Sequence, residues 1–368
     1  MPSELKNNFA YTIRKPLGVV AVITPWNFPL AIPIWKIAPA LVCGNTVVFK
    51  PASSTPMTAI EIVKLFQDAG LPRGVLNMVT GPGGEVGDEL IKHPIVRAVS
   101  FTGSTEIGQR IYGEASSRMK KVQCEMGGKN AVVVLNDADL DLAVEGIVQG
   151  AFGSTGQRCT ATSRAVVEEK MYDVFMEKLI TRTRRLKIGN GMREDVEVGP
   201  LASESQFKKV LSCIAMGKEE GATLELGGRP LAGVQFDNGY YIEPTIFTNV
   251  KPEMTIAQEE IFGPVLAVMK AQDYKQAIDL ANSANFGLSA SIYTSNVYRS
   301  FDFIDDIEAG MIHINSPTLG GEAQLPFGGV KASGMGTREQ GTEAIDFFSE
   351  LITVYIDYTA KRREAKFI

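Results

Sequence analysis

Apolar, β-rich runs alternate with amphipathic helical segments between residues 17 and 136, and this alternation constrains the fold more than any other feature of the chain. Strands are predicted at residues 18–23, 46–50, 75–80, 97–102 and 121–125. Helices are predicted between them at residues 32–42, 58–70, 85–92 and 104–116. Such an alternation forms right-handed βαβ units whose strands lie parallel in one sheet. The sequence therefore predicts an α/β fold with a doubly wound, Rossmann-type sheet, an architecture that often binds nucleotides but proves no chemistry by itself.

A second α/β unit is predicted to begin after Asp137, with helices at residues 140–150 and 171–186. A chain of 368 residues exceeds what one hydrophobic core usually holds, so two domains are expected. Residues 347–357 alternate apolar and polar side chains, which predicts an exposed strand. Because an unpaired terminal strand is a liability unless another chain covers it, we expect a homo-oligomer, a dimer or tetramer.

Composition excludes several classes of function. The net charge is -5 and the chain has no basic stripe, which argues against nucleic acid as a partner; the basic cluster Lys361–Arg363 reads as a solvated tail. No apolar run is long enough to span a membrane, and the first 15 residues lack the apolar core of a signal peptide, so we expect a cytoplasmic protein. Four widely spaced cysteines fit neither a disulfide framework nor a zinc site, and no metal is expected.

Cys159 lies in a run of glycines and small polar residues, Phe-Gly-Ser-Thr-Gly-Gln-Arg-Cys-Thr, directly after Arg158. A thiol becomes a nucleophile as thiolate, and a nearby cation lowers its pKa while small neighbours admit a substrate carbon. A packed, unreactive cysteine is the alternative. The other three cysteines, Cys43, Cys124 and Cys213, lie in apolar or periodic runs and are expected in the core.

Polar side chains follow several predicted strands, at the sheet edge where ligands bind in parallel α/β folds. Asn27 lies between two prolines and could donate a hydrogen bond to an oxyanion, or could serve only as a turn residue. Lys50 and Ser53 could contact a ribose or phosphate, and Ser104 opens a helix whose N-terminus favours phosphate. The chain has only two histidines, so Glu125 is the natural general-base candidate, with a solvated strand-end carboxylate as the alternative.

Seven segments in this order closely resemble motifs of the aldehyde dehydrogenase superfamily of NAD(P)-dependent enzymes. They are PWNFP, FKPAS, FTGST, EMGGKN, GQRCTA, EEIFGPV and PFGGVKASG. The resemblance runs from about Arg14 to the C-terminus. It implies an NAD(P)-binding domain at 17–127, a catalytic domain at 128–336, and oligomerisation strands in 1–16 and 337–368.

The resemblance also implies a role for individual residues. Cys159 would attack the aldehyde carbon, the Asn27 side chain and the Cys159 backbone N–H would hold the oxyanion, and Glu125 would activate water to release the acid. The residues implied to bind the NAD or NADP cofactor are Trp26, Lys50, Ser53, Gly103, Ser104, Glu260 and Phe262. The residues implied to line the aldehyde tunnel are Phe28, Trp35 and Phe327.

The chain departs from the family pattern at two points. Ser53 stands where many NAD-preferring members carry a glutamate, and a hydroxyl can accommodate the 2'-phosphate that a carboxylate repels, so we expect dual or NADP-leaning use. The family's N-terminal segment of about 100 residues is absent ahead of Gly18. This absence predicts exposed apolar surface, lowered stability and altered assembly. The alternative to an active dehydrogenase is therefore an inactive fragment that at most binds nucleotide or partner subunits; a thiol esterase is a third reading.

Three stretches look most like bacterial semialdehyde members of the family, especially 2,5-dioxovalerate (α-ketoglutaric semialdehyde) dehydrogenases. They are residues 26–41, 157–164 and 315–322. A broad-specificity aliphatic aldehyde dehydrogenase is the nearest alternative. A carboxylated substrate would favour a cation in its tunnel, and the sequence does not identify that cation.

Overall fold

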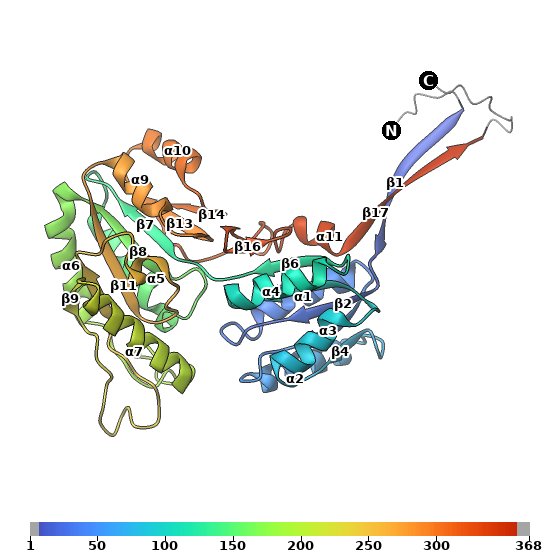
Figure 1. Cartoon of the computed structure of the whole chain (residues 1–368), viewed down its shortest axis with the longest axis horizontal. Coiled ribbons are helices and arrows are strands. Elements are labelled where there is room, and N and C mark those ends of the chain that lie inside the picture. The colour runs from blue at the N-terminus through green and yellow to red at the C-terminus, as the bar shows by residue number, and fades with distance from the viewer. Residues whose placement is uncertain (1–6, 359–368) are drawn as a thin grey trace. The chain divides into compact units, whose positions relative to one another are not determined.

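The structure is a computed structural model that describes residues 7–358 (Figure 1). The basic cluster 361–363 and the first six residues of the predicted 1–16 strand lie outside the described residues. The chain divides into two compact units. Among described residues, unit 1 contains 7–100, 113–122 and 339–358, and unit 2 contains 101–112 and 123–338.

Unit 1 is built on short parallel strands separated by helices. Strands β2 (Val19–Ile23), β3 (Thr46–Lys50) and β4 (Leu76–Met78) pair in parallel. They belong to a sheet of order β16-β6-β5-β2-β3-β4, whose other members are β5 (Val96–Thr102), β6 (Lys121–Glu125) and β16 (Gly334–Met335). The helices of unit 1 are α1 (Ala31–Val42), α2 (Pro56–Asp68), α3 (Asp88–Lys92) and α11 (Glu343–Phe347). Helix α4 (Thr105–Ser116) is divided, because its residues 105–112 belong to unit 2 and its residues 113–116 to unit 1.

The core of unit 1 joins segments that are far apart in the sequence. Val20, Val22, Val47 and Phe49 of the sheet pack with side chains of α1, α2 and α11. A fully buried ion pair adds a polar link, since Lys36 of α1 contacts Glu339 and also donates to Ser100 Oγ at 3.0 Å. Through Glu339 and helix α11, residues near the C-terminus therefore belong to the same unit as the N-terminal strands.

A two-stranded ribbon projects from unit 1 (Figure 1). Strands β1 (Asn8–Pro16) and β17 (Ser349–Asp357) pair antiparallel along their whole length, from Asn8↔Asp357 to Pro16↔Ser349. The predicted strand at 347–357 is present, but β1 pairs with it, so it is not the unpaired strand that the sequence suggested.

Unit 2 contains a seven-stranded sheet of order β14-β13-β7-β8-β11-β10-β9. Its strands are β7 (Asn130–Val134), β8 (Thr162–Glu168), β9 (Thr223–Leu226), β10 (Thr245–Thr248), β11 (Val265–Ala271), β13 (Ser289–Tyr293) and β14 (Met311–Ile314). Strands β12 (Phe286–Gly287) and β15 (Val330–Lys331) form a separate antiparallel pair. The helices are α5 (Leu140–Phe152), α6 (Tyr172–Arg184), α7 (Glu204–Glu219), α8 (Thr255–Gln258), α9 (Tyr274–Asn282) and α10 (Val297–Asp306).

Both faces of this sheet are buried. Val132 and Val134 of β7 pack in the core under α5 and α6, whereas Ala131 and Val133 pack in the core under α7, α9 and α10. Successive side chains of a strand point to opposite faces, so a strand covered on both sides is apolar throughout, as β7 is.

The α/β fold with parallel sheets confirms the predicted fold class. Strands β3 and β6 have the predicted bounds, and most other elements differ at their ends. The helix predicted at 85–92 is interrupted: residues Gly83–Gly87 form a π-helical turn before α3 begins. Three glycines in that turn disfavour an α-helix.

Within residues 7–358, every helix is too short or too polar to cross a bilayer, and no group of three His, Cys, Asp or Glu side chains could hold a metal.

Candidate active site

The predicted site residues fall into two groups, one in each unit. Unit 1 carries Trp26, Asn27, Phe28, Trp35, Lys50 and Ser53. Unit 2 carries Gly103, Ser104, Glu125, Cys159, Glu260, Phe262 and Phe327. The contacts described below bring Glu125, Cys159 and Glu260 together within unit 2.

The two glycines of EMGGKN let this turn approach Cys159 and Glu260 closely. A Cβ at Gly127 would lie 2.4 Å from Glu260 Oε2, and a Cβ at Gly128 would lie 2.6 Å from the Cys159 carbonyl oxygen. The Gly128 N–H also donates to Glu260 Oε1 at 3.0 Å. Any side chain at either glycine would displace one of these groups, so the motif is explained by close approach of the backbone.

Glycines also allow close approach between two further pairs of motifs, GQRCTA with EEIFGPV and PFGGVKASG with EMGGKN. Gly156 of GQRCTA has a φ of +65°, and a Cβ there would lie 2.2 Å from the Gly263 carbonyl oxygen of EEIFGPV. Gly328 of PFGGVKASG has a φ of +151°, and a Cβ there would lie 2.4 Å from Glu125 Oε1. The four motifs therefore form one site in unit 2 because their glycines admit neighbouring backbone and carboxylate groups.

Cys159 is half-buried, and its thiol lies near two carboxylates. Burial, together with the negative charges of Glu260 and Glu125, raises the pKa of the Cys159 thiol to about 12. Hydrogen bonds from the backbone N–H groups of Thr160 and Cys159 act in the opposite direction. The sequence suggested that a nearby cation lowers this pKa, but the Arg158 guanidinium donates to Ser154 Oγ at 2.8 and 3.0 Å, and burial dominates.

The chain turns through a left-handed segment just before Cys159. Ser154, Thr155 and Gly156 have φ values of 51°, 59° and 65°. Left-handed backbone is unfavourable for residues other than glycine, so neighbours must hold it in place. Thr155 Oγ1 donates to the Gly199 carbonyl at 3.0 Å, and Gln157 Oε1 accepts from the Ala202 N–H at 2.9 Å. The segment 199–202 thus supports the strained approach to the thiol.

Glu125 ends strand β6 and is 2% exposed. Its backbone pairs with Gly334 of β16 and accepts from the Gly103 N–H at 3.1 Å. The predicted carboxylate is therefore buried in a site and is not a solvated strand end. Burial raises the pKa of the Glu260 carboxyl. The hydrogen bond from the Gly128 N–H and the positive charges of Lys209 and Lys129 lower it, but burial has the larger effect.

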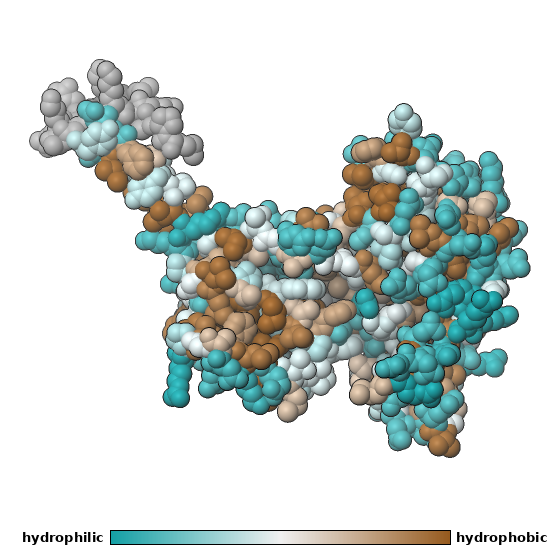
Figure 2. Space-filling model, turned by 180° about the vertical axis from the view of Figure 1, so that it is seen from behind, coloured by the Kyte–Doolittle hydropathy of each residue, from teal (hydrophilic) through white to brown (hydrophobic). Residues whose placement is uncertain are grey.

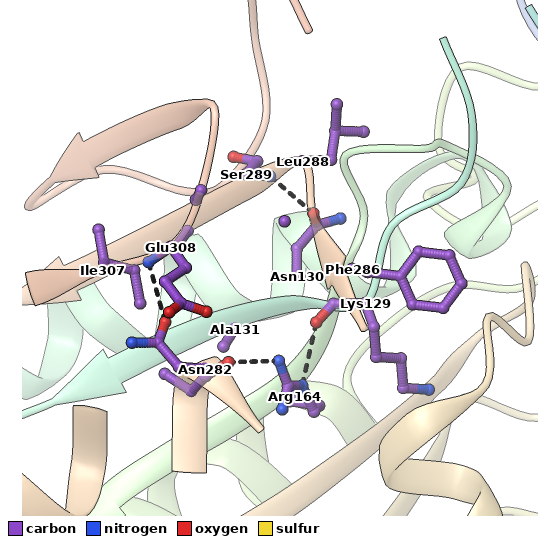
Figure 3. A pocket seen from close by; sticks show the side chains of 14 residues that line it. Lys129, Asn130, Ala131, Arg164, Asn282, Phe286, Leu288, Ser289, Ile307 and Glu308 are labelled. Atoms are coloured by element: carbon purple, nitrogen blue, oxygen red, sulfur yellow. Dashed lines mark hydrogen bonds between the residues drawn. The ribbon is translucent and has the colours of Figure 1, made fainter. Parts of the chain in front are cut away.

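Two cations are buried behind the EMGGKN turn (Figure 3). Lys129 is 2% exposed, its Nζ donates to the Glu259 carbonyl at 2.7 Å, and burial lowers the pKa of its ammonium to about 7. Arg164 donates to the carbonyls of Lys129, Leu280 and Ala281. The cavity that these residues line has a volume of about 10 Å³, room for roughly one water molecule, so it is no substrate pocket.

The remaining predicted residues have chemistry that fits a nucleotide cofactor. Lys50 ends β3, is 5% exposed, and its pKa is lowered by burial; Ser53 is exposed beyond it. The Ser104 carbonyl accepts from the Gly108 N–H at 2.9 Å in the first turn of α4, so the free N–H groups of a twelve-residue helix begin there. An ammonium group, a hydroxyl group and a helix N-terminus can all hydrogen-bond to the phosphate or ribose oxygens of a nucleotide.

The aromatic residues differ in burial. Phe327 is 7% exposed, and its ring lies against Gly321, where a Cβ would come within 2.9 Å. Trp26, Phe28 and Trp35 are half-buried in unit 1, and Phe262 is half-buried with a left-handed φ of 58°. Of the other cysteines, Cys124 and Cys213 are buried, and Cys43 is half-buried against the unit 1 core.

Three buried polar residues that hold the Cys159 segment were not predicted as site residues from the sequence, namely Asn130, Ser289 and Thr318. Asn130 is the last residue of EMGGKN, so its place in a motif could have drawn attention to it. Thr318 lies in the stretch 315–322 that resembles semialdehyde members of the family, whereas Ser289 lies in none of the quoted motifs or stretches. Only the fold brings these two residues to Cys159.

Comparisons with known proteins find a family model and relatives that match most of this chain. A model of the aldehyde dehydrogenase family matches residues 1–354. The alpha-ketoglutaric semialdehyde dehydrogenase of Bacillus subtilis is 53% identical over 356 residues, which cover 97% of this chain and 73% of that protein. The 2,5-dioxopentanoate dehydrogenase of Saccharolobus solfataricus is 48% identical, with 96% and 74% covered. A crystal structure of Staphylococcus aureus betaine aldehyde dehydrogenase with NAD+ superposes with a TM-score of 0.96 at 36% identity, covering 98% of this chain and 71% of that one.

Proposed function

Because the chain belongs to the NAD(P)-dependent aldehyde dehydrogenase family, we propose that it oxidises a semialdehyde to the carboxylic acid with Cys159 as nucleophile. The observation that carries this proposal is the grouping of the Cys159 thiol with Glu125 and Glu260 in unit 2. A thiol and a nearby carboxylate base are the minimum equipment for covalent catalysis on a carbonyl carbon.

The first half of the reaction forms a bond from sulfur to carbon. Because the pKa of the free thiol is about 12, the thiol needs a base, and Glu125 takes its proton. The thiolate then adds to the aldehyde carbon. The Cys159 backbone N–H is a donor for the resulting oxyanion, and the family resemblance assigns the second donor to Asn27.

A bound nicotinamide supplies the hydride acceptor that oxidises the carbon. The residues that would hold the cofactor are Trp26, Lys50, Ser53, Gly103, Ser104, Glu260 and Phe262. Loss of hydride leaves a thioester on Cys159. Glu125 must first release the thiol proton to solvent, and it then takes a proton from water as the water attacks the thioester. The carbon–sulfur bond breaks, the acid leaves, and Glu125 returns its proton to the Cys159 sulfur, which restores the thiol.

The substrate class is supported by the relatives. The Bacillus subtilis and Saccharolobus solfataricus proteins are named for α-ketoglutaric semialdehyde and 2,5-dioxopentanoate, and each is more similar to this chain than the betaine aldehyde dehydrogenases found in the same comparison, at 44% identity. We therefore propose α-ketoglutaric semialdehyde as the substrate.

The test follows cofactor reduction by its absorbance with α-ketoglutaric semialdehyde, betaine aldehyde and an aliphatic aldehyde, each with NAD and NADP. Wild type is compared with Cys159→Ala, and an ester is assayed in parallel. Cys159-dependent reduction that is fastest with the semialdehyde supports the proposal. Cys159-dependent ester hydrolysis without cofactor reduction indicates a thiol esterase, and neither activity indicates a chain that at most binds nucleotide or other subunits.

We further propose a homo-oligomer that assembles through the β1–β17 ribbon. An isolated two-stranded ribbon is marginally stable in water, and large exposed apolar patches mark interaction surfaces. The ribbon and the residue after it expose seven large apolar side chains: Phe9, Tyr11, Leu351, Ile352, Tyr355, Ile356 and Tyr358. Figure 2 shows apolar side chains along it.

A further inference from the structure

Three consecutive backbone carbonyls at the nucleophile each accept a hydrogen bond from a buried side chain. Asn130 Nδ2 donates to the carbonyl oxygens of Cys159 and Ala161, both at 2.8 Å. Thr318 Oγ1 donates to the carbonyl oxygen between them, that of Thr160, at 2.7 Å. Water can satisfy the carbonyls of an exposed segment, so such a segment needs no side-chain donors. Side-chain hydrogen bonds to three successive carbonyls therefore indicate that residues 159–161 are held in one geometry.

The two donors are themselves fixed. Asn130 is 3% exposed, and its Oδ1 accepts from the Ser289 N–H at 2.9 Å (Figure 3). Ser289 Oγ donates to the Thr318 carbonyl at 2.8 Å, which joins both donors in one network. Gly128 completes the fit, because a Cβ there would lie 2.6 Å from the Cys159 carbonyl oxygen and 2.8 Å from Asn130 Oδ1.

The Cys159 carbonyl has a direct link to the thiol. A peptide unit is planar, so this carbonyl and the Thr160 N–H move as one rigid group. That N–H is one of the two backbone groups that lower the pKa of the Cys159 thiol. A bond from Asn130 to the carbonyl therefore sets the direction in which the N–H points.

We propose that Asn130 is a positioning residue: by holding the Cys159 carbonyl, it aims the Thr160 N–H at the Cys159 sulfur and stabilises the thiolate. This inference rests on the proposed function only in taking Cys159 as the nucleophile. Thr318 holds the next peptide unit, whose N–H belongs to Ala161, so its removal disturbs the same network without releasing the Thr160 N–H. The charged groups that act on the thiol, Glu125, Glu260 and Arg158, are untouched by changes at either position.

The test measures alkylation of Cys159 by iodoacetamide between about pH 7 and pH 9.5, where the rate follows the thiolate fraction. The variants are Asn130→Ala, Gly128→Ala, which pushes the same contact apart from the other side, and Thr318→Val as the matched control of equal burial. Mass spectrometry identifies the modified cysteine, Cys159→Ala gives the background, and near-ultraviolet circular dichroism selects the variants that are folded.

Loss of one hydrogen bond to a charged sulfur predicts that Asn130→Ala is alkylated about tenfold more slowly at each pH, with Thr318→Val near wild type. We expect Gly128→Ala to slow alkylation of Cys159 by a similar factor. This variant tests the proposal if Asn130→Ala does not fold. Wild-type rates in the folded Asn130 or Gly128 variant, or equal slowing in Thr318→Val, overturn the proposal. Because alkylation needs neither aldehyde nor cofactor, absence of dehydrogenase activity counts against the proposed function alone.

Discussion

At the scale of single residues, the state of the Cys159 thiol depends on a balance between burial, two carboxylates and two backbone N–H groups. Glu260→Gln removes one negative charge and keeps the oxygen that accepts from Gly128. We expect a lower thiol pKa and faster alkylation of Cys159 at a given pH. Wild-type alkylation rises about tenfold per pH unit from pH 7 to pH 10 without a plateau, because the pKa is about 12. Glu259→Gln removes an exposed neighbouring charge and is the control; an equal gain in that variant contradicts a local effect at the thiol.

Ser53 is a second residue whose chemistry can be tested alone. It is exposed beyond β3, and its Oγ donates to the Gly81 carbonyl at 3.4 Å. We expect Ser53→Glu to lower kcat/KM for NADP by about tenfold or more and to leave that for NAD nearly unchanged, because a carboxylate repels the 2'-phosphate. Ser54→Glu, one residue further along the exposed turn, is the matched control. Equal losses with both cofactors in Ser53→Glu contradict a role in selection.

Lys129 makes stability depend on pH. Its folded pKa of about 7 lies below the usual lysine pKa of 10.5, so between those pH values the unfolded chain binds more protons than the folded one. The free energy of unfolding therefore rises with pH in this window, by up to about 1.4 kcal/mol per unit. Urea titrations at about pH 7.5 and pH 9 measure this. We expect Lys129→Met to flatten the dependence, whereas the exposed Lys208→Met does not; an unchanged slope in Lys129→Met contradicts the assignment.

At the scale of elements, Arg164 of β8 joins the sheet of unit 2 to the end of α9. Its guanidinium donates to the carbonyls of Leu280 and Ala281 in the last turn of that helix and to the Lys129 carbonyl. Arg164→Met removes the buried guanidinium donor from these three carbonyls, of which that of Leu280 keeps the Ser283 N–H and Oγ as donors. We expect a loss of about 3 kcal/mol or more in the free energy of unfolding. Arg299→Met breaks an exposed ion pair with Asp302 and should cost about 1 kcal/mol or less. Similar losses in both variants contradict the role of Arg164.

At the scale of the whole molecule, the β1–β17 ribbon exposes large apolar side chains on both of its strands. Phe9 and Ile356 face each other in its register and are 52% and 42% exposed. We expect Phe9→Lys together with Ile356→Lys to lower the molar mass in light scattering, because charge opposes burial of the ribbon against another copy. Met192→Lys with Val234→Lys, two exposed apolar positions in unit 2, is the control. A wild-type monomer, or an unchanged mass in the ribbon variant, contradicts assembly through the ribbon.

The sequence alone determined the class of fold and the residue types of the site. Apolar strands such as Thr46–Lys50 alternate with helical segments in a period that only a parallel α/β sheet satisfies. Motifs such as GQRCTA and EMGGKN could be located because glycines, a thiol and a carboxylate are local properties of the chain.

Only the tertiary structure decided what surrounds these residues. Ser289 and Thr318 lie more than 120 residues from Cys159 and reach its segment through β13 and the strands beside it. The thiol pKa likewise depends on burial and on Glu260, which no local pattern places next to Cys159. Sequence fixes which chemical groups are present, whereas the pKa and orientation of each group depend on neighbours that folding brings from distant segments.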